Sequence, residues 1–279
     1  MGMSPVRRPL RAAISLLLVT ASAVLAGCSG GGTDNVLQRV QDNGTLRVAL
    51  TQANPPWNYL DDAGKPVGYD VDVAHEMARR IGVEDVEFVA SNFQSFIEGV
   101  RAGRFDIVIS GQTITDERKK QVDFSRPYQV NGVSIFVPAA GGAVSSLADL
   151  EGKTVAVSAG TTQEKFAREE IPGVQVKTYQ NATLGLTDLS RGNADAMLVS
   201  RFQGTYLAKQ NQLQVRPVGK LLESEVNAMS FRKGSTEFKK EIDQAIADMM
   251  ADGTLTRISQ QWLDLDMTQE LQALPAEQG

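Results

Sequence analysis

Cysteine and histidine are nearly absent from this chain. Among its 279 residues there is one cysteine, Cys28, and one histidine, His75. Protein zinc sites take most of their ligands from clusters of these two residue types, and no such cluster can form here. His75 also falls outside the apolar stripe of the helix expected around it, so we expect a solvated surface residue and not a catalytic base. The sequence therefore predicts neither a metal site nor a cofactor.

A positive net charge is also missing. The chain carries 28 Lys and Arg against 33 Asp and Glu, a formal net charge of -5 at pH 7. Arg7, Arg8 and Arg11 lie in the first 27 residues, which contain no acidic residue, so a chain beginning at Cys28 keeps 25 basic and 33 acidic side chains. Nucleic-acid binding depends on Lys and Arg that neutralise phosphates. We expect no nucleic-acid partner.

The apolar run near the amino terminus is too short for a membrane-spanning helix. It covers residues 12–26, follows three arginines and is interrupted by Ser15, Thr20 and Ser22. A spanning helix needs about 20 consecutive apolar residues. This layout is typical of a secretory signal peptide over residues 1–27.

The end of that segment resembles a bacterial lipobox. Leu25, Ala26 and Gly27 precede Cys28, and in such lipoproteins the cysteine thiol receives a diacylglyceryl group and becomes the first mature residue. Lipidation would also explain a lone unpaired thiol in a secreted protein; the alternative is a signal peptide with an incidental cysteine. Residues 28–33, rich in Gly, then form a flexible tether. We expect an extracytoplasmic protein that is lipid-anchored to the membrane at Cys28.

Short β-rich runs alternate with amphipathic stretches twice along the rest of the chain. Ala74, Met77, Ala78 and Ile81 recur at helical spacing and give one apolar stripe. Such alternation predicts α/β layers of parallel strands with right-handed crossovers, and about 245 residues are consistent with two lobes. We expect strands at 46–50, 86–89, 105–109, 154–157, 174–178, 196–199 and 228–232, and helices at 71–81, 96–102, 162–170, 184–191, from 236, and through Ile258 and Trp262.

Three segments in this order resemble the family 3 extracellular solute-binding proteins, the polar amino-acid receptors of ABC importers. They are Gly-Tyr-Asp-Val-Asp-Val-Ala at 68–74, Ser-Gly-Gln-Thr-Ile-Thr-Asp-Glu-Arg at 110–118 and Ala-Gly-Thr-Thr-Gln-Glu at 159–164. The closing Asp-Gly-Thr at 252–254, followed by Trp262, also fits. Each segment alone is a weak signal, and their combination is specific.

The resemblance spans roughly residues 45–265 and implies a two-lobed periplasmic-binding-protein-like α/β fold of type II. Each lobe would hold a mostly parallel sheet flanked by helices, and two crossing strands would form the hinge. The first lobe would comprise residues 34–130 and the return segment 225–279, and the second lobe residues 131–224. The implied function is the binding component of an ABC transporter, a monomer that closes around a small carboxylate-bearing solute, an amino acid or a derivative, and delivers it to a membrane permease.

The first half of the expected site follows the strand at 105–109. A guanidinium offers a fixed fork of donors that matches a carboxylate, and in the family the arginine at the position of Arg118 grips the ligand's α-carboxylate. The alternative is a surface ion pair between Arg118 and a nearby acidic residue. The resemblance places Ser110, Gly111 and Thr113 against the carboxylate and amino groups of the ligand.

The second half of the expected site opens a helix directly after a glycine. Thr161 and Glu164 have the spacing of a capping box, which alone explains Glu164. A helix amino terminus also favours anions through its free N–H groups and its dipole, so Thr161 and Thr162 would receive a carboxylate that Arg118 holds from the other side. Lobe closure would then follow from one ligand bridging both halves.

Position 200 departs from the family pattern. Receptors for amino acids usually carry an aspartate there, which pairs with the ligand's α-ammonium, whereas this chain has Ser200 followed by Arg201. Burying an ammonium without a carboxylate partner is unfavourable. Either the ligand lacks a free α-amino group or another residue supplies the charge.

The side-chain end of the expected pocket involves Asn54, Trp57 and Phe93. Receptors for basic amino acids tend to carry an acidic group near Thr51 and an aromatic one near Asn54, and this chain has neither, which disfavours lysine and arginine as ligands. Trp57 and Phe93 are either apolar walls of the pocket or ordinary core residues.

Two other functions are compatible with this fold. A dehydratase-like enzyme needs an acid or a base in its cleft, and the expected lining offers Arg, Thr, Ser, Asn and Gln instead, so we do not expect an enzyme. The other alternative is a receptor that reports to a membrane sensor, which the sequence does not separate from a transport protein.

Overall fold

The computed structural model describes residues 35–141, 144–222, 224–263 and 265–274. The expected signal peptide, the lipidated Cys28 and the tether at 28–33 lie outside these described residues. Within the described part of the chain, no helix has both the length and the apolar character needed to cross a membrane.

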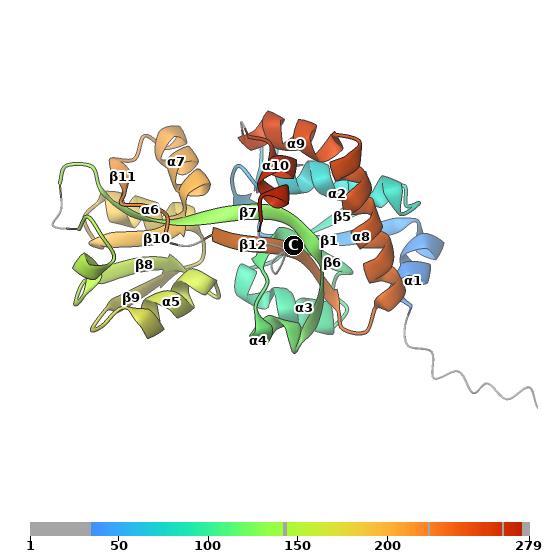
Figure 1. Ribbon diagram of the computed structural model, residues 1–279, viewed down its shortest axis with the longest axis horizontal. Helices are drawn as coiled ribbons and strands as arrows, with labels where there is room; N and C mark the ends of the chain where they lie inside the picture. The colour runs from blue at the N-terminus through green and yellow to red at the C-terminus, as the bar shows by residue number, and fades with distance from the viewer. Residues whose placement is uncertain (1–34, 142–143, 223, 264, 275–279) are drawn as a thin grey trace, which may run out of the picture. The chain divides into compact units, whose positions relative to one another are not determined.

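The first lobe is built on three parallel strands in the order β5, β1, β6 (Figure 1). Alternate residues of β1 enter two separate cores, because successive side chains of a strand point to opposite faces. Val48 packs in the core that contains α2 and α8, and Ala49 packs in the core that contains α3. The elements before the hinge are α1 (Val36–Asn43), β1 (Thr45–Leu50), a small sheet of β2 (Ala53–Asn54), β3 (Asn58–Leu60) and β4 (Pro66–Val67), α2 (Tyr69–Arg80), β5 (Asp85–Ala90), η1 (Phe93–Ser95), α3 (Phe96–Arg101), β6 (Ile107–Thr113) and α4 (Asp116–Lys119).

The second lobe repeats this design with the parallel strands β10, β8 and β9. Val155 and Val157 of β8 enter one core with α5, whereas Ala156 enters another core with α6. Its elements are η2 (Ala148–Leu150), β8 (Thr154–Ser158), α5 (Thr162–Glu170), β9 (Gln175–Tyr179), α6 (Ala182–Ser190), β10 (Ala196–Ser200), α7 (Arg201–Gln210) and β11 (Val215–Val218).

Two long antiparallel strands, β7 (Val122–Pro138) and β12 (Ser224–Arg232), connect the lobes (Figure 1). They lie side by side in the sheet order β6, β12, β7, β10. The expected lobe boundary between residues 130 and 131 falls within β7, where Val130 pairs with Val226 and Asn131 pairs with Glu225. The predicted two-lobed α/β architecture with a two-strand hinge is therefore confirmed.

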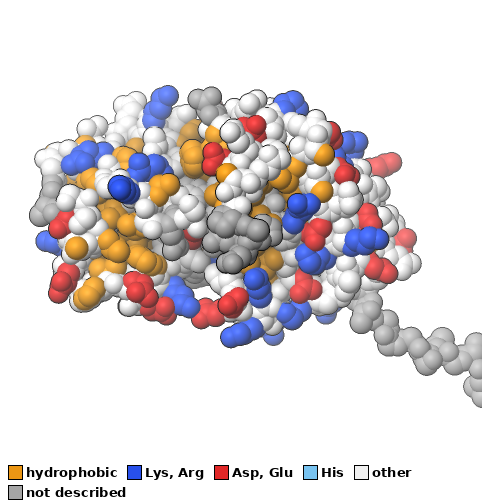
Figure 2. Space-filling model, viewed as in Figure 1, with side chains coloured by type: hydrophobic (Ala, Val, Ile, Leu, Met, Phe, Trp, Pro, Cys, Tyr) orange, Lys and Arg blue, Asp and Glu red, His pale blue; other side chains and the backbone are white. Residues whose placement is uncertain are grey.

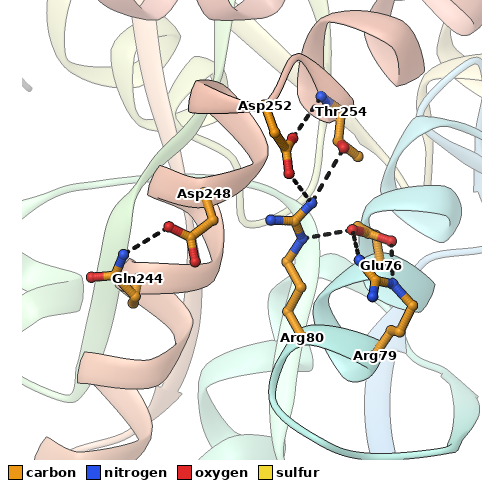
Figure 3. Close-up of polar contacts among 7 residues, drawn as sticks. All are labelled: Glu76, Arg79, Arg80, Gln244, Asp248, Asp252 and Thr254. Carbon is orange, nitrogen blue, oxygen red and sulfur yellow. Dashed lines mark hydrogen bonds and ion pairs between the residues drawn. The ribbon is translucent and has the colours of Figure 1, made fainter.

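The return segment after β12 completes the first lobe with α8 (Thr236–Ala251), α9 (Thr254–Leu263) and α10 (Met267–Gln272). Arg80 at the end of α2 contacts this segment through polar side chains (Figure 3). Its guanidinium lies 2.6 Å from a carboxylate oxygen of Glu76 and 2.7 Å from one of Asp252, and it donates to the Thr254 hydroxyl at 3.2 Å. One cation thus joins α2 to the turn between α8 and α9.

The two lobes differ in surface character on the face shown in Figure 2. Hydrophobic side chains gather over the lobe of β8 to β11, whereas acidic and basic side chains are mixed over the other lobe. Leu184, Phe202 and Leu221 of the second lobe are exposed large hydrophobic residues.

The expected strands and helices agree with the structure in type and shift by a few residues at their ends. Helix α5 occupies the predicted residues, and α2 begins two residues before the predicted 71–81. The strand predicted at 105–109 begins later and runs to Thr113, because its polar end pairs with β12. Helices α1, α7 and α10 and the strands β2, β3, β4 and β11 were not expected.

Candidate functional site

A cavity of about 90 Å³ lies where residues from both lobes meet the hinge strands. Thr113 comes from the first lobe, Thr162 from the second, and Asn131 and Glu225 from the hinge. Nine of the ten residues expected to contact a ligand line this cavity: Asn54, Trp57, Phe93, Ser110, Gly111, Thr113, Thr161, Thr162 and Ser200.

The tenth expected residue, Arg118, lies beside the cavity lining. Arg118 is only 9% exposed. One terminal nitrogen donates to the Thr113 carbonyl at 2.8 Å, and the other donates across the lobes to the Gly160 carbonyl at 2.9 Å. The guanidinium also lies over the Phe93 ring, 5.5 Å from its centroid. Arg118 is thus at the junction of the lobes, next to Thr161.

The electrostatic environment of Arg118 combines burial with two carboxylates. Burial lowers the pKa of Arg118 from its usual value, and the charges of Glu225 and Glu117 act in the opposite direction. Glu117 forms its own ion pair with Lys165 of the second lobe, at 2.7 Å. The guanidinium stays charged because its usual pKa lies far above neutrality.

Helix α5 begins at the cavity. Thr161 is its N-cap, and the Thr161 hydroxyl accepts from the Glu164 amide at 3.2 Å. Glu164 reaches back to the Gly160 amide at 2.8 Å, one residue before the cap. This variant of the expected capping box leaves the first amides of α5 at the cavity, where they favour negative charge.

Ser200 ends β10 and caps α7. Its hydroxyl donates to the Asn131 amide oxygen at 2.5 Å and accepts from the Gln203 amide at 3.5 Å. Arg201 does not line the cavity: its guanidinium donates to the Ser134 hydroxyl at 2.7 Å and to the Gly219 carbonyl at 3.0 Å. The positive charge beside Ser200 is therefore directed away from the site.

Glu225 is the functional candidate that the sequence did not indicate. This residue of β12 lines the cavity and is only 4% exposed. Its carboxylate accepts from the Thr113 hydroxyl at 3.2 Å, from the Gln163 side-chain amide at 2.7 Å and from the Thr162 hydroxyl. Glu225 adds a hydrogen-bonded carboxylate to the expected lining of Arg, Thr, Ser, Asn and Gln, because pairing between β7 and β12 brings a residue distant in sequence into the cleft.

A buried polar network fixes the first-lobe edge of the cavity. The Tyr128 hydroxyl donates to Asp70 at 2.8 Å and accepts from the Gly111 amide at 2.9 Å. The Asn58 side-chain amide nitrogen lies 2.7 Å from Asp70 and 3.1 Å from the Ser110 hydroxyl. Burial raises the pKa of Asp70 to about 7, although the hydrogen bonds from Asn58 and Tyr128 lower it. Asp70 thereby positions Ser110 and Gly111 without lining the cavity.

The aromatic end of the cavity contains both Trp57 and Phe93. Trp57 is buried and packs edge-on against Tyr69, with ring centroids 5.7 Å apart, and against Phe202 of the second lobe at 6.4 Å. The Asn54 amide oxygen accepts from the side chain of Gln203, also across the lobes. Trp57 is therefore a wall of the cavity and a core residue at the same time.

Gln129 brings polar side-chain atoms to the cavity wall. It lies on β7, lines the cavity and is fully buried, and neither its amide oxygen nor its amide nitrogen has a hydrogen-bond partner among the described residues. Buried side-chain amides are nearly always hydrogen-bonded in folded proteins. Unpaired donors and acceptors in a cavity indicate a place for a polar ligand or for water.

Comparisons with known proteins identify relatives of this chain. The family model of bacterial extracellular solute-binding proteins, family 3, matches residues 46–265. The L-cystine-binding protein TcyJ of Escherichia coli is 34% identical over 257 residues, which cover 91% of this chain and 96% of that protein. The histidine-binding periplasmic protein of Salmonella typhimurium is 28% identical over 236 residues, 80% of this chain and 88% of that protein.

Solved structures show the same likeness. An ancestral arginine-binding protein bound to arginine superposes with a TM-score of 0.74 at 38% identity, over 78% of this chain and 98% of that chain. The ancestral amino acid-binding protein AncCDT-1, a precursor of cyclohexadienyl dehydratase, superposes with a TM-score of 0.76 at 35% identity, over 81% of this chain and 99% of that chain. By sequence and by fold, the chain belongs to the family 3 bacterial extracellular solute-binding proteins.

Proposed function

We propose that this protein captures one small solute with a free carboxylate, an amino acid or a derivative, by closing its two lobes around it. The observation that carries the proposal is the buried guanidinium of Arg118 at the lobe junction, beside a small cavity lined by polar groups of both lobes. Arg118 and the start of α5 would hold the carboxylate from opposite sides. Relatives described as cystine-binding and histidine-binding support an amino-acid ligand.

The proposal includes delivery to an ABC permease by a monomer held at the outer face of the membrane. The names of several relatives place them with ABC transporters, and the family consists of extracellular proteins. Cys28 would carry the lipid, and residues 28–33 would give the folded part freedom to reach the permease.

Calorimetry with a panel of L-amino acids and their decarboxylated amines tests the ligand class. We expect at least one amino acid to bind and its amine to bind far more weakly. Arg118→Ala should weaken binding of that amino acid by about 30-fold or more, since breaking a buried charge pair costs about 2–5 kcal/mol. Arg118→Lys keeps the charge but not the fork of donors. Its affinity should lie between those of the unaltered protein and of Arg118→Ala.

Arg101→Ala is the matched control, because Arg101 is an exposed arginine of the same lobe whose one ion pair among the described residues is with Glu98. It should bind like the unaltered protein. Equal binding of an amino acid and its amine, or full affinity in a folded Arg118→Ala variant, would contradict the proposal. Mass spectrometry of the solute retained through purification would then identify the true ligand class.

Glu225 is the one observation that favours the dehydratase-like alternative, since it is a carboxylate in the cleft. Its two oxygens already accept hydrogen bonds from three side chains. That environment stabilises the ionised form and suits binding better than proton donation. Incubation with prephenate separates the alternatives, because a binding protein yields no product.

A further inference from the structure

We propose that Glu225 holds the cationic group of the ligand, so that the site selects solutes in which an ammonium lies next to the carboxylate. This inference rests on the proposed function and narrows it to α-amino acids with a free amino group. Its starting point is the charge of the cavity wall: Glu225 is the only ionisable side chain among the described residues that line it.

Arg118 and Glu225 carry opposite charges, and both form a hydrogen bond with Thr113. Thr113 accepts from Arg118 through its carbonyl and donates to Glu225 through its hydroxyl. The cation and the anion of the protein therefore lie on either side of a single residue. An α-amino acid is also a close pair of opposite charges, with its carboxylate and its ammonium on one carbon atom. The two charge pairs are complementary when the ligand's carboxylate faces Arg118 and its ammonium faces Glu225.

The hinge strands supply further acceptors beside Glu225. Asn131 is the cross-strand partner of Glu225. Gln129 lies two residues before Asn131 on β7 and therefore points to the same face of the strand. Both line the cavity, and the buried amide of Gln129 has no protein partner in the described chain. An ammonium group has three donors and no acceptor. One carboxylate and two side-chain amide oxygens on one face of the hinge match that requirement.

The position of Glu225 also explains how this chain can have Ser200 where the family usually has an aspartate. Ser200 lies opposite Val133 in the strand register, but its hydroxyl donates to Asn131 of β7, and Asn131 pairs with Glu225 of β12. A carboxylate is therefore linked to Ser200 through Asn131, two strands away. The ligand does not need to lack an amino group for Ser200 to be tolerated.

The competing account of Glu225 is a latch between the lobes. Its carboxylate accepts from Thr113 of the first lobe and from Thr162 and Gln163 of the second, which joins the lobes. A latch would change the affinity for every ligand by the same factor. A charge partner would change only the affinity for ligands that carry the ammonium.

The test uses matched pairs of probes that differ by the amino group: L-arginine and guanidinovalerate, and L-cystine and dithiodipropionate, alongside any further amino acid from the panel and its desamino acid. We expect the unaltered protein to favour the amino acid over the desamino acid by about 100-fold. Glu225→Gln, which keeps the size and the acceptor oxygen, should reduce that ratio to about tenfold or less. Glu225→Asp, which keeps the charge, should retain most of the ratio.

Glu117→Gln is the control, because Glu117 also acts on Arg118 but lies outside the cavity lining. It should leave the ratio unchanged. Equal affinities of the unaltered protein for both members of each pair would overturn the inference without any variant. An unchanged ratio in Glu225→Gln, or equal weakening or strengthening of both probes, would overturn it in favour of a latch.

The decarboxylated amines agmatine and cystamine separate this result from failure of the proposed function. If the unaltered protein binds them as well as the parent amino acids, the carboxylate site at Arg118 is wrong and the inference is refuted with it. If the amines are rejected and the desamino acids are accepted, the proposed function stands and the role of Glu225 alone is refuted.

Discussion

Replacement of Gly160 by alanine should hold the lobes apart. Gly160 precedes the cap of α5 and has a φ of +78°. A Cβ atom there would lie 2.7 Å from the Cβ and 2.8 Å from the Cα of Gln94, which belongs to the first lobe. Carbon atoms pack at about 3.5–4.0 Å. The two surfaces would therefore have to separate by roughly 1 Å, and the Gln94 backbone cannot rotate out of the way.

The magnitude follows from the two effects of the new methyl group. Alanine at positive φ costs about 1–2 kcal/mol in backbone strain, in the open and the closed protein alike. Overpacking against Gln94 costs a further 1–3 kcal/mol, typical of an added methyl group in a tight contact, and only when the lobes close. Ligand affinity should therefore fall by about 5- to 150-fold.

Gly192→Ala separates the two effects. Gly192 lies in the same lobe and also has a φ of +78°, but no atom lies within 4 Å of the position that its new methyl group would occupy. Both variants should lose thermal stability to a similar extent, but only Gly160→Ala should bind the ligand more weakly by calorimetry and fail to contract with ligand in small-angle scattering. If the two variants bind equally well, contact between Gly160 and Gln94 is not part of the closed state.

Two further predictions concern stability. The folded-state pKa of Asp70 is raised to about 7, so between about pH 4 and pH 7 the folded protein keeps a proton that the unfolded chain has released, and the free energy of unfolding falls by about 4 kcal/mol as pH rises through this window. Urea unfolding of Asp70→Asn should lack this decline, and parallel pH profiles of the two proteins would contradict the assignment. Arg80→Met should lower the free energy of unfolding by about 1–3 kcal/mol, since it removes three polar contacts of a nearly buried guanidinium, whereas Arg79→Met, at an exposed ion pair, should change it by less than about 0.5 kcal/mol. Equal losses in the two arginine variants would show that burial of Arg80 is not the cause.

Local sequence signals were sufficient for most of the regular elements. Helix α5 has a capping threonine before it, and α2 has a clear apolar stripe, so both were placed within two residues of their observed ends. Helix α7 has no comparable stripe, because its buried residues are Gln203, Gly204 and Leu207. Gly204 packs directly on the Phe136 ring of β7. This helix depends on tertiary packing that no short window of sequence contains.

The residues of the candidate site also differ in whether local sequence signals indicate them. The prediction of residues 110–118 and 161–162 rested on compact motifs, at the end of β6 and at the start of α5, that resemble the family. Glu225 could not be identified in this way, since its place in the cavity depends on the register between β7 and β12, which joins residues about a hundred positions apart. The role of Asp70 was also hidden, because a carboxyl group in a fully buried network looks like any helix-starting aspartate in sequence.

The strands that connect the two lobes also form one wall of the cavity, through Gln129, Asn131 and Glu225. Under the proposed function, a solute in this cavity would contact the connecting strands as well as both lobes. Any substitution in this wall that changes the ligand specificity should therefore also change how readily the lobes open and close. Selectivity and release rate should consequently change together in engineered or evolved variants, and a receptor of this design cannot readily gain one without shifting the other.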